Sequence, residues 1–239
     1  MRKLFFANWK MYLSDDEAES LARAYDEGAV SASVDVAVAP GFTVIERVAR
    51  VLAASKVALG AQDAFWKDEG AYTGEVAPKQ LAALGVKYVI VGHSERRAMG
   101  ETDDMIARKA ALVATDGMTP VLCVGELKEE REAGRQEEIV RGQLAAVRGT
   151  LPADVPLVVA YEPRWAIGTG VPCEPSDVAE MHAMIRTIVG ADTPILYGGS
   201  VDPKNFASYL DLHDVDGLLV GGASARPDDV RAFFEAFSS

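Results

Sequence analysis

The chain alternates between short apolar runs and longer amphipathic stretches along its whole length. The apolar runs are rich in aliphatic residues and too short for typical helices, so they predict buried strands. We expect strands at residues 4–8, 34–39, 57–62, 88–91, 121–124, 157–161, 195–197 and 215–220. The intervening patterns predict helices at residues 42–54, 102–114, 129–147, 176–189 and 227–237, and another that opens at Ser14 before three acidic residues.

Apolar strands that alternate with helices are typical of a parallel sheet whose outer face is covered by the helices. Eight strand–helix units in 239 residues leave about 30 residues for each unit, the size of one such repeat. A closed (β/α)8 barrel of the α/β class accommodates this pattern best. An open doubly wound sheet is the rival, but no Gly-x-Gly-x-x-Gly motif follows the first strand. Without a linker or a shift in composition, we expect residues 1–239 to form one domain.

Charge and composition narrow the class of partner. The formal net charge is -12, which disfavours nucleic acid or an anionic membrane surface as a partner. No apolar run approaches the roughly 20 residues that a membrane span needs. Asn8 and Lys10 interrupt the first apolar stretch, so we do not expect a secretory signal there. We expect a protein of the cytoplasm.

The cysteines and histidines are too few for a disulfide framework or a zinc site. Cys123 and Cys173 are the two cysteines, and three histidines accompany them. We interpret Cys123 as a packing residue, and His182 and His213 as ordinary surface or packing residues. The sequence therefore predicts no metal site.

Glu162 directly follows the strand expected at residues 157–161. Pro163 ends that strand, because proline has no N–H for the hydrogen-bond ladder. A carboxylate at a rigid strand end is a good general base. It could equally be a helix cap or a solvated charge, so the choice depends on what the other strand ends supply.

Other strand ends carry a cation, a neutral donor and glycine clusters. In a barrel, the carboxyl ends of the strands meet at one mouth, where active residues lie. These ends supply Asn8, Lys10, His93, the Gly198-Gly199-Ser200 segment and the Gly221-Gly222 pair. Each has an ordinary alternative: a surface lysine, a structural histidine or a tight turn. Glycine clusters at the last two strands are typical of a phosphate site built from backbone amides, and their coincidence with the other features favours an active site.

The stretch of residues 63–77, from Asp63 to Ala77, is here called the aromatic loop. It has no helical period, yet it carries Phe65, Trp66 and Tyr72. Exposed aromatic side chains are costly, so the loop either folds back on its own barrel or docks on another subunit. The residues alone favour folding back.

Three motifs resemble those of the triosephosphate isomerase family. They are AYEPRWAIGTG at residues 160–170, VGHSERR at 91–97 and GAYTGE at 70–75. The resemblance extends from the NWK segment at residues 8–10 to GGAS at 221–224. It implies a cofactor-independent homodimer of glycolysis and gluconeogenesis that interconverts dihydroxyacetone phosphate and D-glyceraldehyde 3-phosphate. It also implies that the aromatic loop docks on the partner subunit.

The resemblance assigns roles to individual residues. Glu162 matches the family's general base, His93 its electrophile and Lys10 the cation of the site. The positions that match its substrate-binding and supporting residues are Asn8, Gly168, Ser200, Gly221, Gly222, Glu95 and, from the partner subunit, Thr73.

Two alternatives remain open. Another phosphate-binding barrel, such as an aldose–ketose isomerase of amino-acid biosynthesis, would share the glycine-rich site but lack the His93 and Glu162 segments. A non-catalytic barrel that only binds a sugar phosphate would not need an intact base and electrophile.

Overall fold

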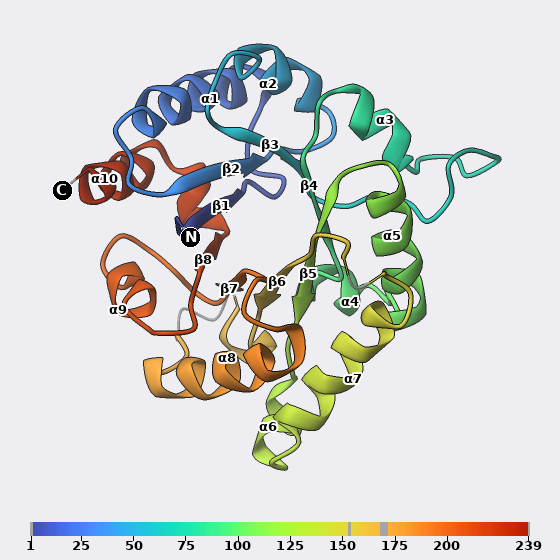
Figure 1. The fold of residues 1–239 in the computed structure, drawn as a ribbon. Coiled ribbons are helices and arrows are strands. Elements are labelled where there is room, and N and C mark those ends of the chain that lie inside the picture. The colour runs from blue at the N-terminus through green and yellow to red at the C-terminus, as the bar shows by residue number, and fades with distance from the viewer. Residues whose placement is uncertain (1, 153, 168–171, 239) are drawn as a thin grey trace.

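The computed structural model describes residues 2–152, 154–167 and 172–238. Within them, eight strands pair in sequence order, and the last pairs with the first to close a barrel (Figure 1). All pairings are parallel. The strands are β1 (Leu4–Asn8), β2 (Asp35–Ala39), β3 (Ala58–Ala61), β4 (Tyr88–Val91), β5 (Thr119–Val124), β6 (Val158–Tyr161), β7 (Ile195–Tyr197) and β8 (Gly217–Val220). The predicted (β/α)8 barrel is confirmed.

Helices surround the strands and shield the outer face of the barrel (Figure 1). They are α1 (Asp15–Ala29), α2 (Ile45–Val51), α3 (Pro78–Ala83), α4 (Ser94–Ala98), α5 (Asp103–Thr115), α6 (Lys128–Glu132), α7 (Gln136–Arg148), α8 (Pro175–Val189), α9 (Phe206–Leu210) and α10 (Pro227–Phe237). Two 3-10 turns, η1 (Arg164–Ala166) and η2 (Gly222–Ala225), follow β6 and β8. Within the described residues, each helix is too short or too polar to cross a bilayer.

Most expected elements lie within a few residues of the observed ones, but two expected helices are wrong in extent. The helix expected at residues 129–147 is broken into α6 and α7. Gly134 between them has a φ of 69°, a left-handed conformation that ends a helix. The helix expected at residues 42–54 is shortened to α2. The sequence pattern did not resolve α3 and α9, because five or six residues span too few turns to show a period.

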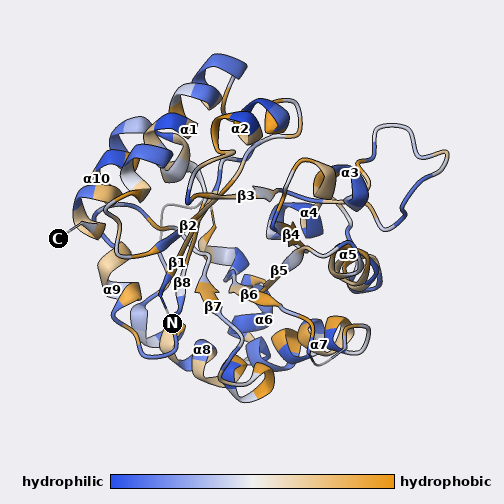
Figure 2. Ribbon diagram, turned by 45° about the horizontal axis from the view of Figure 1, so that its top comes forward, coloured by the Kyte–Doolittle hydropathy of each residue, from blue (hydrophilic) through white to orange (hydrophobic). Residues whose placement is uncertain are grey.

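The core has two layers because each strand is buried on both faces. Phe6, Ile90 and Cys123 belong to the layer inside the barrel, and all three are fully buried. The larger layer lies between the strands and the helices. Figure 2 shows the hydrophobic strands at the centre and hydrophilic residues on the outer faces of the helices. Burial on both faces explains the near-continuous apolar runs of the sequence.

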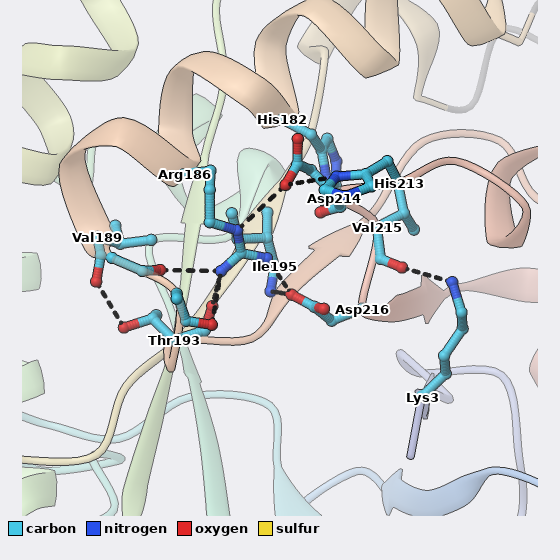
Figure 3. Close-up of polar contacts among 12 residues, drawn as sticks. Lys3, His182, Arg186, Val189, Thr193, Ile195, His213, Asp214, Val215 and Asp216 are labelled. Carbon is cyan, nitrogen blue, oxygen red and sulfur yellow. Dashed lines mark hydrogen bonds and ion pairs between the residues drawn. The ribbon is translucent and has the colours of Figure 1, made fainter. Parts of the chain in front are cut away.

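Arg186 of α8 ties together the segments that lead into β7 and β8 (Figure 3). Its Nη1 donates to the carbonyl of Thr193 at 2.6 Å, and its Nε lies 3.4 Å from the carboxylate of Asp214. Its Nη2 also binds the carboxylate of Asp216, which accepts a hydrogen bond from the backbone of Ile195 at 2.8 Å. This network lies at the amino ends of the strands, the end of such barrels that serves stability.

Candidate active site

A cavity of about 460 Å³ opens where the strands end. Seven of the predicted site residues line it: Asn8, Lys10, His93, Glu162, Ser200, Gly221 and Gly222. They lie at or just after the carboxyl ends of β1, β4, β6, β7 and β8, so barrel closure brings together positions that are far apart in the sequence. The predicted Gly168 lies outside the described residues. Glu95 and Thr73 do not line this cavity.

Glu162 is held at the end of β6 with its side chain buried. One carboxylate oxygen lies 3.1 Å from Nε2 of His93, and the other accepts a hydrogen bond from the backbone N–H of Ser94 at 2.9 Å. The chain passes close to β5 here, because the Glu162 N–H donates to the carbonyl of Val124 at 2.7 Å. A Cβ on Gly125 would lie 1.7 Å from the Glu162 carbonyl oxygen, so only glycine permits this approach.

Cys123 lies inside the barrel beside Glu162. Burial raises the pKa of the Cys123 thiol, and the neighbouring Glu162 carboxylate raises it further. The thiol therefore stays protonated and adds no second negative charge next to the carboxylate.

His93 is oriented by the first turn of α4. The backbone N–H of Glu95 donates to Nδ1 of His93 at 3.2 Å, so Nδ1 is an acceptor. A neutral imidazole has one donor and one acceptor nitrogen, which assigns the proton to Nε2. That nitrogen points to Glu162. The ring thus presents an uncharged donor at the cavity.

Lys10 has an unusual backbone conformation, with a φ of 51°. A positive φ is strained for a residue with a Cβ, and such strain gathers at functional sites. The Lys10 N–H donates to Oδ1 of Asn8 at 3.1 Å, and its carbonyl accepts from Nε2 of Gln62 at 2.6 Å. Its Nζ lies 2.5 Å from the Glu95 carboxylate. These contacts aim the ammonium group at the cavity.

The segments after β7 and β8 expose little side-chain bulk to the cavity. Ser200 donates its hydroxyl to the carbonyl of Ala166 at 2.6 Å, and its own carbonyl accepts from Asn205 at 3.1 Å. After β8, the Ser224 hydroxyl donates to the carbonyl of Gly221 at 2.7 Å. These bonds fix both segments with their backbone at the cavity, as an anion site made of amides requires.

Glu126 is a buried residue of this region that the sequence analysis did not select. Its carboxylate accepts from Nε1 of Trp165 at 2.9 Å and from the hydroxyl of Tyr161 at 3.1 Å, and it lies 3.3 Å from Arg131. It therefore anchors the residues on both sides of Glu162. The sequence analysis selected polar residues at the carboxyl ends of the strands, which is here called the strand-end rule. Glu126 lies just after β5, so the rule that selected Glu162 could also have selected Glu126.

Gln62 and Tyr12 were also missed. Gln62 lies one residue after β3, so the strand-end rule could have selected it. Tyr12 lines the cavity, but it follows β1 by four residues and carries no strand-end signal.

The root of the aromatic loop is bound to its own barrel by buried charges. The Asp63 carboxylate lies 2.7 Å from Nζ of Lys109, which also contacts Glu101, and 2.8 Å from Arg96. Burial raises the pKa of Asp63, and Lys109 opposes that rise.

The tip of the aromatic loop stands away from the barrel (Figure 1). Phe65 is buried and packs against Trp66 and Tyr72, with ring centroids 4.1 and 4.7 Å from its own and the rings tilted. Tyr72 and Thr73 are exposed. The expectation that the aromatic loop folds back on its own barrel therefore describes Phe65 but not the exposed tip of the loop.

No group of three or more His, Cys, Asp or Glu side chains suited to a metal ion occurs in the described part of the chain.

Comparison with known proteins gives one family. A family model described as triosephosphate isomerase matches residues 3–237. The triosephosphate isomerase of Nitratidesulfovibrio vulgaris (strain DP4) is 46% identical over 95% of this chain and 96% of its own length. That of Herpetosiphon aurantiacus is 44% identical over 95% and 96%, respectively. That of Bacteroides fragilis is 41% identical and covers 100% of both chains.

Proposed function

Because the chain belongs to the triosephosphate isomerase family, we propose that Glu162, His93 and Lys10 carry out the chemistry of that family in a catalytic domain formed by residues 1–239. The protein is an isomerase that interconverts dihydroxyacetone phosphate and D-glyceraldehyde 3-phosphate, a reaction of glycolysis. The observation that carries the residue roles is the approach of Glu162 and His93 to 3.1 Å at the wall of one cavity.

Glu162 acts as the base. Its carboxylate takes a proton from the substrate carbon next to the carbonyl, the electrons of the C–H bond form a C=C bond, and the carbonyl oxygen becomes an enediolate oxygen. The proton returns from Glu162 to the neighbouring carbon, so atoms and electrons balance without an added reactant. Its buried position and fixed contacts support the role, because a positioned base contributes about 10²–10⁴-fold.

His93 acts as the electrophile. Its Nε2–H donates to the oxygen on which negative charge develops, and the ring moves a proton between the two substrate oxygens. The hydrogen bond from Glu95 to Nδ1 supports this role because it leaves the ring neutral with the proton on Nε2. A neutral histidine electrophile is the known arrangement of this family.

Lys10 stabilises the enediolate by its charge. A fixed cation is most effective in a site from which water is excluded, because the local dielectric constant is low. Its contact with Glu95 supports the role by holding the ammonium group at the cavity edge.

The substrate phosphate binds to backbone amides at Ser200, Gly221 and Gly222, with Gly168 as a fourth position outside the described residues. Amide donors suit this chain, because its net charge of -12 offers no attraction to an anion at long range. The rigid, unobstructed backbone after β7 and β8 supports this proposal.

The proposed enzyme is a homodimer. The aromatic loop of each subunit docks on the other subunit. A groove of about 460 Å³ next to the active site is lined in part by Met11, Phe42 and Met99. Met11 is 96% exposed and Met99 is 73% exposed. Exposed apolar side chains that gather in one groove are typical of a surface that another protein surface buries. The partner subunit's Thr73 would then approach Glu95. We expect this dimer in the cytoplasm, where glycolysis runs.

Glu162→Gln tests the assignment of the base. In a coupled assay with glyceraldehyde 3-phosphate, we expect kcat to fall at least about 10²–10⁴-fold, while inorganic phosphate still binds. Glu180→Gln is the matched control, because it makes the same change on an exposed position of α8. Glu162 is not the base if Glu162→Gln turns over as fast as the control.

A further inference from the structure

Tyr12 lies where the active-site cavity meets the neighbouring groove, and its side chain lines both. The residue is 63% exposed. Its backbone N–H donates to the carbonyl of Trp9 at 3.4 Å, but its hydroxyl has no hydrogen-bond partner among the residues that the structure describes. Among those residues, the Tyr12 hydroxyl is therefore an unused donor at the rim of the cavity.

The Tyr12 ring lies against Gly222. A Cβ built on Gly222 would be 3.7 Å from Cε2 and 3.9 Å from the hydroxyl oxygen of Tyr12. A Cβ built on Gly221 would be 3.0 Å from Cε of Lys10 and 3.3 Å from its Nζ. Lys10 and Tyr12 thus flank two consecutive glycines, one side chain over each. The positive φ of Lys10 turns the chain at this point.

We propose that Tyr12 is a further substrate-binding residue, whose hydroxyl donates a hydrogen bond to the substrate phosphate beside Gly222. This proposal rests on the proposed phosphate site at Gly221 and Gly222. A tyrosine hydroxyl is a neutral donor at physiological pH, so it can bind a phosphate oxygen without the salt dependence of a second cation. Tyr12 then distinguishes phosphorylated from unphosphorylated substrates.

A different role for Tyr12 would be to line only the groove. In that case its hydroxyl would affect the assembly of two copies and not phosphate affinity. The two roles make different predictions for Tyr12→Phe, which removes one oxygen atom and keeps the ring.

The test compares Tyr12→Phe, Tyr12→Ala and the wild type. A hydrogen bond at a partly exposed site is worth a few-fold in affinity, so we expect both the KM for glyceraldehyde 3-phosphate and the inhibition constant of inorganic phosphate to rise about 3- to 10-fold in Tyr12→Phe. We expect kcat to stay within about twofold, since the hydroxyl is remote from the reacting carbons. Tyr12→Ala should be at least as impaired in phosphate affinity. Turnover of unphosphorylated glyceraldehyde should not change.

Tyr88→Phe is the matched control, because it removes the same atom at the start of β4, at the opposite end of the barrel. The native mass of each variant is measured at the assay concentration. An unchanged phosphate inhibition constant in Tyr12→Phe overturns the proposal, and so does a rise that occurs only where the native mass falls. If the wild type binds phosphate but does not isomerise the substrate, the proposed function fails while the phosphate measurements still test Tyr12.

Discussion

His182 is a buried, uncharged histidine that should make the protein less stable in mild acid. Its side chain has no exposed surface and packs edge-on against Tyr161, with ring centroids 5.9 Å apart. Its Nδ1 lies 3.1 Å from the carbonyl oxygen of Asp214, which can only accept, so Nδ1 carries the proton (Figure 3). Its Nε2 has no partner within the described residues. A proton added at Nε2 would therefore bring a buried charge with no acceptor.

Burial lowers the pKa of His182 from 6.5 to about 4, although Asp214 and Asp216 nearby favour the charged form. In the unfolded chain the ring titrates near its usual value, so the unfolded state binds the proton first as the pH falls. Stability is therefore intact above about pH 6.5, is lost progressively down to about pH 4 and changes no further below that. The difference between the pKa of His182 in the unfolded and folded chain corresponds to about 3 kcal/mol in total, of which about 2 kcal/mol is lost between pH 7 and pH 5.

Urea unfolding of the wild type and His182→Gln at several pH values between 7 and 5 measures this loss. We expect the free energy of unfolding of the wild type to fall by about 2 kcal/mol more than that of His182→Gln over this range. Carboxylates titrate equally in both proteins, so the difference isolates His182. Protein concentration is held constant, because dissociation of a dimer would also change the apparent stability.

His213→Gln provides the control. The His213 side chain is 96% exposed, so its variant should follow the pH dependence of the wild type. Parallel stability curves for the wild type and His182→Gln would refute the reasoning, because they would mean that the buried ring gains its proton at no cost to the folded state.

Three further substitutions test close packing and buried charge. A Cβ on Gly198 would lie 2.9 Å from Cγ of Glu162, so Gly198→Ala should lower kcat about 10²-fold in the coupled assay, and unchanged turnover would contradict the placement of the base. A Cβ on Gly217 would lie 2.0 Å from the carbonyl oxygen of Leu4 at the β1–β8 closure, so Gly217→Ala should cost about 3 kcal/mol or more in urea unfolding. Lys109→Met removes the buried cation that Asp63 and Glu101 share and leaves only the partly exposed Arg96 beside them, so it should cost about 3–5 kcal/mol at pH 7, with less effect in acid, where Asp63, whose pKa is raised by burial, becomes neutral.

The apolar pattern was sufficient to predict the strands and their number. The strands expected at residues 4–8, 88–91 and 195–197 have the observed bounds. The pattern failed where a local backbone conformation overrode it. The charged helical pattern at residues 129–147 continues across Gly134, but the left-handed conformation of this glycine interrupts the helix.

The strand-end rule predicted the residue types of the candidate site. It selected Asn8, Lys10, His93, Glu162 and Gly221, which all line one cavity. The rule works because parallel strands in a closed barrel all end at the same mouth.

The atomic contacts of these residues were not predictable. The hydrogen bond from Glu95 to Nδ1 of His93, the positive φ of Lys10 and the approach of Gly125 to Glu162 depend on packing across the barrel. Tyr12 gave no signal for the same reason, since its proximity to Gly222 joins the first and last strands.

Hydrophobic periodicity and turn residues involve only near neighbours in the sequence. The sequence by itself therefore identifies the strands and the polar residues at their ends. Protonation states and close approaches arise between residues separated by up to the whole chain, when β8 pairs with β1 and closes the barrel. Closure sets which donor faces which acceptor and which group loses water, and these two conditions govern the chemistry at the mouth and the charge of His182.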